Sequence, residues 1–167
     1  AILCIAPSIR SQYIDGGNQH SIFLTKQQEV WTMGMNEYGE LGDSTFTTKI
    51  YPVKVKGLPP IQFVSRGYKH SIAIDDQNRV WTWGWNNYGQ LASQLPINYP
   101  YPQVVEGVED VIAVEGGHWH TVALHRNGTV STWGHNFYGE LGNGNREHSE
   151  KPAKIKGLEN IHKIASV

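Results

Sequence analysis

Two histidines separated by one residue, His118 and His120, are the side chains in this sequence that most resemble a metal site. On an extended segment, residues two apart point to the same side of the chain, so both imidazoles could ligate one ion. However, His120 recurs at a fixed interval as His20 and His70. A histidine repeated in this way is expected to make a buried hydrogen bond to backbone, so we predict no metal site here.

Other chemical candidates are equally weak. The glycine-rich stretch 139–145 lacks the Lys-Ser/Thr pair of a phosphate loop and the spacing of a dinucleotide fingerprint. The acidic pair Asp75 and Asp76 precedes Gln77 and Asn78 and is expected to lie in a solvated hairpin turn. No Ser-His-Asp or Cys-His set can be assembled, because each histidine lies at a repeated position or in a variable loop. We therefore expect no catalytic centre and no cofactor.

The chain consists of three copies of one repeat, offset by 50 residues with no insertion or deletion. Self-similarity at this period indicates a propeller or a solenoid, and we call the recurring positions the frame. Residues of the frame are presumed to be architectural. The frame includes Gly17, Gly67 and Gly117; His20, His70 and His120; Gly34, Gly84 and Gly134; Asn36, Asn86 and Asn136; the Tyr-Gly pairs that begin at Tyr38, Tyr88 and Tyr138; and Leu41, Leu91 and Leu141.

Each copy is predicted to form four short strands. In the middle copy these are the β-branched and aromatic runs 61–65, 70–74, 79–83 and 101–107, separated by turn-like segments. Asn127-Gly128 is likewise expected to be a hairpin turn and not a glycosylation site. Both faces of the strands are largely apolar, so each small sheet must be covered on both sides. Four-stranded sheets packed by radial repetition make a β-propeller, and the fold class is therefore all-β.

The repeat boundaries predict three full blades flanked by two orphan strands. The predicted units are a last strand of a preceding blade at 1–10, repeats at 11–60, 61–110 and 111–160, and a first strand of a following blade at 161–167. Closed propellers need roughly 4 to 8 blades, so this ring is incomplete. We expect the chain to be part of a longer propeller or to be completed by other chains, and to associate or be unstable when isolated.

Composition narrows the classes of partner. The formal charge of the 167 residues is −1, which gives no electrostatic reason to expect nucleic acid or an anionic membrane. No apolar run approaches a membrane span, and no signal segment is found. The only cysteine, Cys4, excludes an internal disulfide and suits a reducing compartment. An intracellular location, in cytoplasm or nucleus, is therefore expected over secretion.

Kelch propellers share a period of about 50 residues, so the motif must discriminate between families. The three copies read GGNQHSIFL…VWTMGMNEYGELG, RGYKHSIAI…VWTWGWNNYGQLA and GGHWHTVAL…VSTWGHNFYGELG. This pattern closely resembles the regulator of chromosome condensation repeat, over nearly the whole chain from Ser11 onward.

The resemblance implies a protein-binding propeller with two possible activities. One is guanine-nucleotide exchange on a Ran-type small GTPase, in which the propeller pushes a wedge at the nucleotide site without covalent chemistry. The alternative is a secreted propeller that binds or inhibits a partner, as the family-like β-lactamase inhibitors do. The strict spacing leaves no room for the wedge hairpin in these three copies, so a wedge would lie in other blades.

Strand parity predicts where a partner binds. In a four-stranded meander, the loops after the first and third strands emerge at the same end of the sheet. These loops vary between copies and carry aromatic and basic side chains, the usual anchors of protein interfaces, whereas the opposite hairpins read KQQE, DDQN and HRNG. The predicted partner-binding residues are Tyr68, Lys69, Trp85, Tyr99, His118, Trp119, His135 and Phe137.

Overall fold

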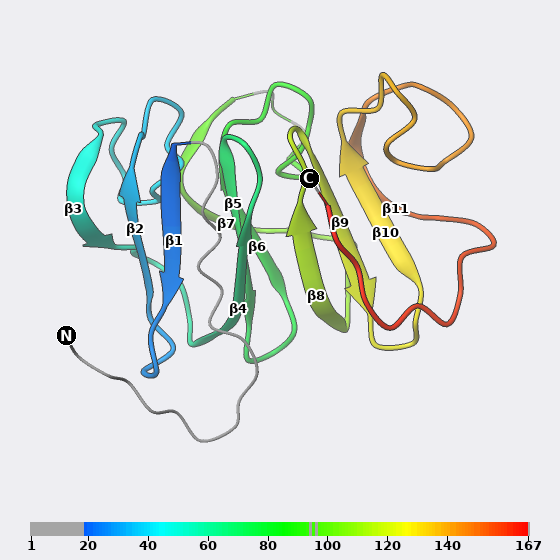
Figure 1. Cartoon of the computed structure of the whole chain (residues 1–167), viewed down its shortest axis with the longest axis horizontal. Helices are drawn as coiled ribbons and strands as arrows, with labels where there is room; N and C mark the ends of the chain where they lie inside the picture. The colour runs from blue at the N-terminus through cyan, green and yellow to red at the C-terminus, as the bar shows by residue number, and fades with distance from the viewer. Residues whose placement is uncertain (1–18, 94, 96, 167) are drawn as a thin grey trace.

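The computed structural model describes residues 19–93, 95 and 97–166, which form eleven β-strands in three antiparallel sheets (Figure 1). The first sheet contains β1 (His20–Leu24), β2 (Val30–Gly34) and β3 (Lys49–Lys54). The second contains β4 (Ile61–Arg66), β5 (His70–Asp75), β6 (Val80–Gly84) and β7 (Tyr99–Val104). The third contains β8 (Val111–Gly116), β9 (His120–His125), β10 (Val130–Gly134) and β11 (Ser149–Lys154). In every sheet the strands pair in chain order, as meanders do.

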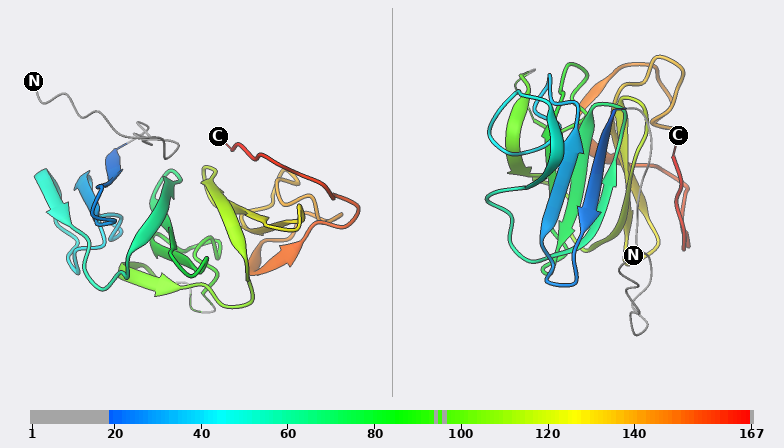
Figure 2. Two further views of the ribbon diagram at one scale, coloured as in Figure 1. Left: turned by 90° about the horizontal axis from the view of Figure 1, so that it is seen from below. Right: turned by 60° about the vertical axis from the view of Figure 1, so that its left-hand side comes forward.

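The three sheets follow one another around an arc that does not close into a ring, which the left view of Figure 2 makes plain. The predicted all-β propeller architecture and its incomplete ring are therefore confirmed. The strand expected at 1–10 and the first strand of the repeat 11–60 lie outside the described residues. Residues 161–166 form no strand, so their role in a following blade stays a prediction.

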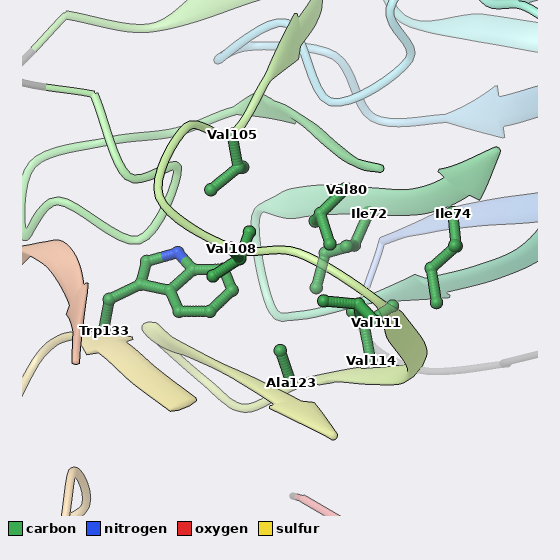
Figure 3. Close-up of a cluster of buried hydrophobic side chains, with 9 residues drawn as sticks. All are labelled: Ile72, Ile74, Val80, Val105, Val108, Val111, Val114, Ala123 and Trp133. Carbon is green, nitrogen blue, oxygen red and sulfur yellow. The ribbon is translucent and has the colours of Figure 1, made fainter. Parts of the chain in front are cut away.

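The hydrophobic core lies between neighbouring sheets. Its larger part joins the second and third sheets (Figure 3) and consists of Ile72, Ile74, Val80, Val105, Val108, Val111, Val114, Ala123 and Trp133. A second cluster joins the first and second sheets around Trp83. Trp83 and Trp133 share the strand position directly before the repeated glycine, which predicts that they are core residues. Each is 0% exposed, and the prediction is confirmed. Each indole also bonds to the preceding sheet, because the Nε1 atoms of Trp83 and Trp133 donate to the carbonyls of Glu40 and Gln90 over 2.8 and 2.9 Å.

The glycine that ends the third strand of each blade is required by its backbone. Gly34, Gly84 and Gly134 have φ angles of 111°, 105° and 107°, which side chains with a Cβ rarely adopt. A Cβ on Gly134 would also lie 2.6 Å from the carbonyl oxygen of Trp119. This glycine therefore lets the loop before the second strand pass directly over the end of the third.

The repeated histidines bond to side chains of the next blade, and the prediction of a backbone partner was wrong. His70 Nε2 lies 3.2 Å from the hydroxyl of Thr121, which donates to the carbonyl of Gln90 over 2.9 Å. Because that hydroxyl proton is already used, the histidine must be the donor. His20 makes the same contact with Ser71 over 3.0 Å. The frame histidine thus links adjacent blades, a relation that one repeat considered alone does not reveal.

Burial keeps these histidines uncharged. Loss of hydration, with a smaller contribution from the positive charge of Arg66, lowers the pKa of both His20 and His70 to about 3. Their imidazoles are neutral at physiological pH and act as structural hydrogen-bond donors.

The expectation of a solvated Asp75 was also wrong. The side chain is 0% exposed and its carboxylate accepts hydrogen bonds from Arg79 Nε at 2.7 Å and Trp81 Nε1 at 2.9 Å. Burial favours the protonated acid, but bonds from Trp81 and Arg79 outweigh it and hold the pKa of Asp75 below its usual value. The pair Asp75 and Asp76 has the composition of a turn, but the Asp75 carboxylate is buried within the hairpin and only Asp76 of the two is exposed.

Two smaller expectations concern turns and membranes. Gly128 N donates to the carbonyl of His125 over 2.9 Å and has a φ of 80°, so the hairpin turn predicted at Asn127-Gly128 is confirmed. Within the described ranges, no helix has the length and apolar character needed to cross a bilayer.

Candidate recognition surface

The loops that precede the second strand and follow the third strand of each blade meet at one end of the sheets, the upper edge in Figure 1. Antiparallel pairing fixes this arrangement: His70 of β5 pairs with Gly84 of β6, and His120 of β9 with Gly134 of β10. The residue that follows each glycine therefore lies beside the loop that precedes each histidine. The backbone shows this directly, since Trp85 N donates to the carbonyl of Lys69 over 2.8 Å.

Two tryptophans and a tyrosine form the centre of this end. The ring centroids of Trp85 and Trp119 are 6.0 Å apart and their planes are inclined at 68°. Tyr88 lies 5.4 Å from Trp85 and 5.5 Å from Trp119. The predicted neighbourhood of the two tryptophans is therefore confirmed, and both rings remain partly exposed.

A lysine enclosed by aromatic rings lies at one side of this centre. The ammonium nitrogen of Lys69 is 4.2 Å from the ring centroid of Tyr38, 5.6 Å from that of Tyr68 and 6.0 Å from that of Trp85. Tyr68 also stacks on His118, with centroids 4.5 Å apart and planes inclined at 19°. Cation–π attraction therefore helps to hold the lysine head at the surface.

A histidine pair lies on the other side, above the third blade. His135 packs 4.7 Å from Tyr88 and 5.2 Å from Trp119, and its Nδ1 lies 2.7 Å from a carboxylate oxygen of Glu140. His148 stacks on His135 with centroids 4.7 Å apart. Hydrogen bonds from the Glu140 amide and from His135 outweigh partial burial and lower the pKa of Glu140, which is therefore an anion beside these rings.

Together these side chains form one connected set, which we call the aromatic surface. Its members are Tyr38, Tyr68, Lys69, Trp85, Tyr88, His118, Trp119, His135, Phe137, Tyr138 and His148. Seven of the eight predicted residues belong to it. The exception is Tyr99, which begins the outer strand β7, bonds through its hydroxyl to Ser93 over 2.8 Å and packs against Tyr101.

Sequence reasoning missed four members of the set. Three are the tyrosines of the repeated Tyr-Gly pair, Tyr38, Tyr88 and Tyr138, which were assigned to the frame. In each blade the residue two positions later fixes the tyrosine through its backbone only: side-chain oxygens of Glu40, Gln90 and Glu140 accept the tyrosine N–H over 2.8, 3.0 and 2.8 Å. The rings are left to the surface, and Tyr138 is 79% exposed.

One asparagine per blade positions the loop between the third and fourth strands. Asn136 Oδ1 accepts the N–H of Leu141 over 2.9 Å, and its Nδ2 donates to the carbonyls of Asn145 and Glu147 over 3.1 and 3.0 Å. Asn36 and Asn86 bind the equivalent leucine amides over the same 2.9 Å. The frame therefore anchors each variable loop from inside.

The histidines of the pair His118 and His120 point to different surroundings. His118 stacks outward on Tyr68, while His120 turns inward to the hydroxyl of Ser166 over 3.1 Å. Across the part of the chain that the structure describes, no group of three or more His, Cys, Asp or Glu residues is placed to hold a metal ion. Aromatic rings, one lysine and several histidines give this arrangement the means to bind another molecule.

Comparison with known families identifies the repeats. A family model described as the Regulator of chromosome condensation (RCC1) repeat matches residues 28–74, 77–124 and 127–167. A second model of the same description matches residues 12–40, 61–90 and 111–140. Comparison with curated protein sequences gives no significant match.

Solved structures show the same architecture. Human WBSCR16 is 28% identical, with a TM-score of 0.77 over 89% of this chain and 40% of that protein. Prp20p from Saccharomyces cerevisiae is 24% identical, with a TM-score of 0.75 over 87% of this chain and 38% of that one. Yeast RCC1 (Prp20) bound to Kap60 is 19% identical, with a TM-score of 0.74 over 96% and 41% of the two chains. The chain thus spans about two fifths of the length of these structures.

Proposed function

The chain belongs to the regulator of chromosome condensation (RCC1) repeat family, and on that premise we propose that it binds another protein through the aromatic surface of its propeller. One observation carries the proposal: side chains from five loops, remote in sequence, converge into one contiguous set of rings around Trp85 and Trp119.

The architecture does not require these rings. The positions equivalent to Trp85 in the other copies are Met35 and His135, and the position of Trp119 is held by Gln19 and Lys69. The equivalent strand pairs β1–β2, β5–β6 and β9–β10 keep the same register around these differences. Partly exposed tryptophan and tyrosine side chains on rigid loops are the usual anchors of protein interfaces, which supports a role in binding.

We further propose guanine-nucleotide exchange on a Ran-type small GTPase as the specific activity. Membership of the family supports it, as does the structure of Prp20p, which is described with its binding properties to Gsp1p and histones. Such exchange needs binding and no catalytic side chain, in keeping with the chemistry of the surface. Further blades, from the same protein or from other chains, would complete the ring and supply the wedge. An intracellular location follows from this activity and fits the single cysteine.

The test uses a purified Ran-type GTPase loaded with a fluorescent guanine nucleotide. Titration calorimetry measures binding, and loss of fluorescence measures exchange. Trp85→Ala and Trp119→Ala are expected to weaken binding by about 2 kcal/mol or more, roughly 30-fold, as interface anchors do. Gln77→Ala and Arg126→Ala, exposed at the opposite end of the sheets, are the matched controls and should change affinity less than about threefold.

The readouts separate two claims. Binding without exchange would refute the proposed exchange activity and would leave the proposed binding surface in place. Equal losses at both ends of the sheets, or losses only at Gln77 and Arg126, would refute the aromatic surface as the binding site. Thermal unfolding of each variant excludes a loss of binding caused by misfolding.

A further inference from the structure

His148 is held in the third blade by a bond that only its neutral form can make. Its Nδ1 accepts the backbone N–H of Asn136 over 3.0 Å. Because an imidazole nitrogen accepts only through an unprotonated lone pair, the proton of this ring is on Nε2. Protonation of Nδ1 would set two N–H groups against each other and break the bond.

The second blade makes the same contact with a side chain that cannot titrate. Asn98 lies 50 positions before His148, and its Oδ1 accepts the backbone N–H of Asn86 over 3.3 Å. An amide oxygen remains an acceptor at every physiological pH. The two blades thus contain a proton-sensitive and a proton-insensitive version of one loop anchor.

The anchored loop, residues 143–148, borders the aromatic surface. Asn136 holds the loop from inside through Asn145 and Glu147, and His148 closes its far end. The ring of His148 lies 4.8 Å from that of Tyr88 and 4.7 Å from that of His135. Release of His148 would therefore free the loop and remove one wall of the surface at the same time.

We propose that His148 is a proton-operated anchor: protonation releases the loop 143–148 and weakens binding at the aromatic surface. The proposal rests on the proposed binding function for its consequence, whereas the release itself is a property of the chain alone. A fall in pH triggers the release, so the surface is complete only at a pH above the range in which His148 becomes protonated.

The charged and titratable groups that face His148 favour its neutral form. Partial burial is the largest cause and lowers its pKa below the usual value, and His135 acts in the same direction. Glu140 opposes both, but its charge is engaged by His135 at 2.7 Å. Tyr88 contributes a neutral ring.

The sign of the effect follows from linkage. A released histidine titrates near pH 6.5 and the anchored one at lower pH, so the anchored state is fully favoured above about pH 6.5 and is lost as the pH falls. Between about pH 7.4 and pH 5.5 the ratio of anchored to released loop falls by at most about tenfold, and partner affinity falls by no more than that factor.

The experiment needs no partner for its first arm. Nitrogen-15 asparagine and histidine are incorporated into the complete protein, and the amide signals of Asn136 and Asn86 are followed by NMR from about pH 7.5 to pH 5.5. The Asn136 amide is expected to titrate together with the His148 ring, with a midpoint below about 6.5, while the Asn86 amide stays constant. Hydrogen exchange of residues 143–148 should accelerate over the same range, after correction for the intrinsic rate.

Two reciprocal variants control the assignment. His148→Asn installs the anchor of the second blade and is expected to abolish the titration of the Asn136 amide while keeping the loop protected. Asn98→His should transfer the titration to the Asn86 amide. A constant Asn136 amide in the unmodified protein, or an unchanged titration in His148→Asn, overturns the proposal, because the latter would assign the proton to His135 or Glu140.

The second arm repeats the GTPase titration at both ends of the pH range with the unmodified protein and with His148→Asn. A fall in affinity that His148→Asn removes supports the proposal, and an affinity that follows pH equally in both proteins overturns its functional part. Failure of the proposed function is seen separately, as retained binding by Trp85→Ala and Trp119→Ala at neutral pH. The Asn136 titration is unaffected by that result.

Discussion

Replacement of Trp133 by alanine should cost the fold far more than replacement of the nearby Trp85. Trp133 is 0% exposed, packs among the valines and isoleucines between the second and third sheets (Figure 3), and donates its Nε1 proton to the carbonyl of Gln90 over 2.9 Å. Replacement of a buried tryptophan by alanine leaves a cavity and lowers the free energy of unfolding by about 3–5 kcal/mol. The Gln90 carbonyl loses one of its two donors but keeps the hydrogen bond from the Thr121 hydroxyl over 2.9 Å, so the lost bond adds no more than about 1 kcal/mol.

The assay is urea unfolding followed by far-ultraviolet circular dichroism, since tryptophan fluorescence changes with the substitution itself. Trp85→Ala is the matched control: it removes the same side chain from the aromatic surface and is expected to lower the free energy of unfolding by less than about 1 kcal/mol. Trp133→Phe separates packing from hydrogen bonding and should lose about 1–2 kcal/mol. A loss below about 1 kcal/mol for Trp133→Ala, or equal losses at Trp133 and Trp85, would mean that the sheet faces are assigned wrongly.

Three further predictions concern the frame. Asp75→Asn should lower the free energy of unfolding at neutral pH by about 1–3 kcal/mol, because a lowered pKa means that the charged carboxylate stabilises the fold above the pKa of the unfolded chain. In urea unfolding, the difference from the unmodified protein should shrink as the pH falls toward about 3. A difference that stays constant with pH contradicts the role of the charge. Because their pKa values are lowered to about 3, His20 and His70 make the free energy of unfolding fall as the pH drops below about 6.5, by about 1.4 kcal/mol each at pH 5.5. His70→Asn should remove the contribution of His70, about 1.4 kcal/mol between neutral pH and pH 5.5, and an unchanged pH dependence would refute the assignment. Gly134→Ala should lower the melting temperature by several degrees and shift the fluorescence of Trp119, because the new Cβ would clash with the Trp119 carbonyl. An unchanged spectrum and melting temperature would show that the loop accommodates the Cβ without strain.

Most of the fold could be predicted from the sequence because the same pattern of residues occurs three times. A constant offset identified the blades, and the shared strand position before the repeated glycine identified Trp83 and Trp133 as core. Antiparallel parity then brought Trp85 and Trp119 to one surface, since the direction of each strand determines where its loops emerge.

What the sequence could not provide was the partner of each frame residue. The repeat marks His70 as structural but is silent on the hydroxyl of Thr121 in the next blade, because period analysis compares copies and not contacts between them. Asp75 was misjudged for a related reason: composition predicts a turn, and only the direction of the hairpin decides which carboxylate turns inward. Tyr99 was placed with the loops although it begins an outer strand.

The repeat also explains how one end of the propeller can specialise while the fold stays constant. The frame fixes the loops by backbone bonds: the carboxylate or amide of Glu40 and Gln90 holds a tyrosine N–H, and Asn86 holds a leucine N–H. Trp85 lies in one of these anchored loops and Trp119 lies beside it, and other residues occupy their positions in the other copies, so these positions can differ from blade to blade. Rings consequently concentrate where the second and third blades meet, around Tyr88. A symmetric frame thus supports an asymmetric surface, and under the proposed function binding specificity would reside in the positions at which the copies disagree.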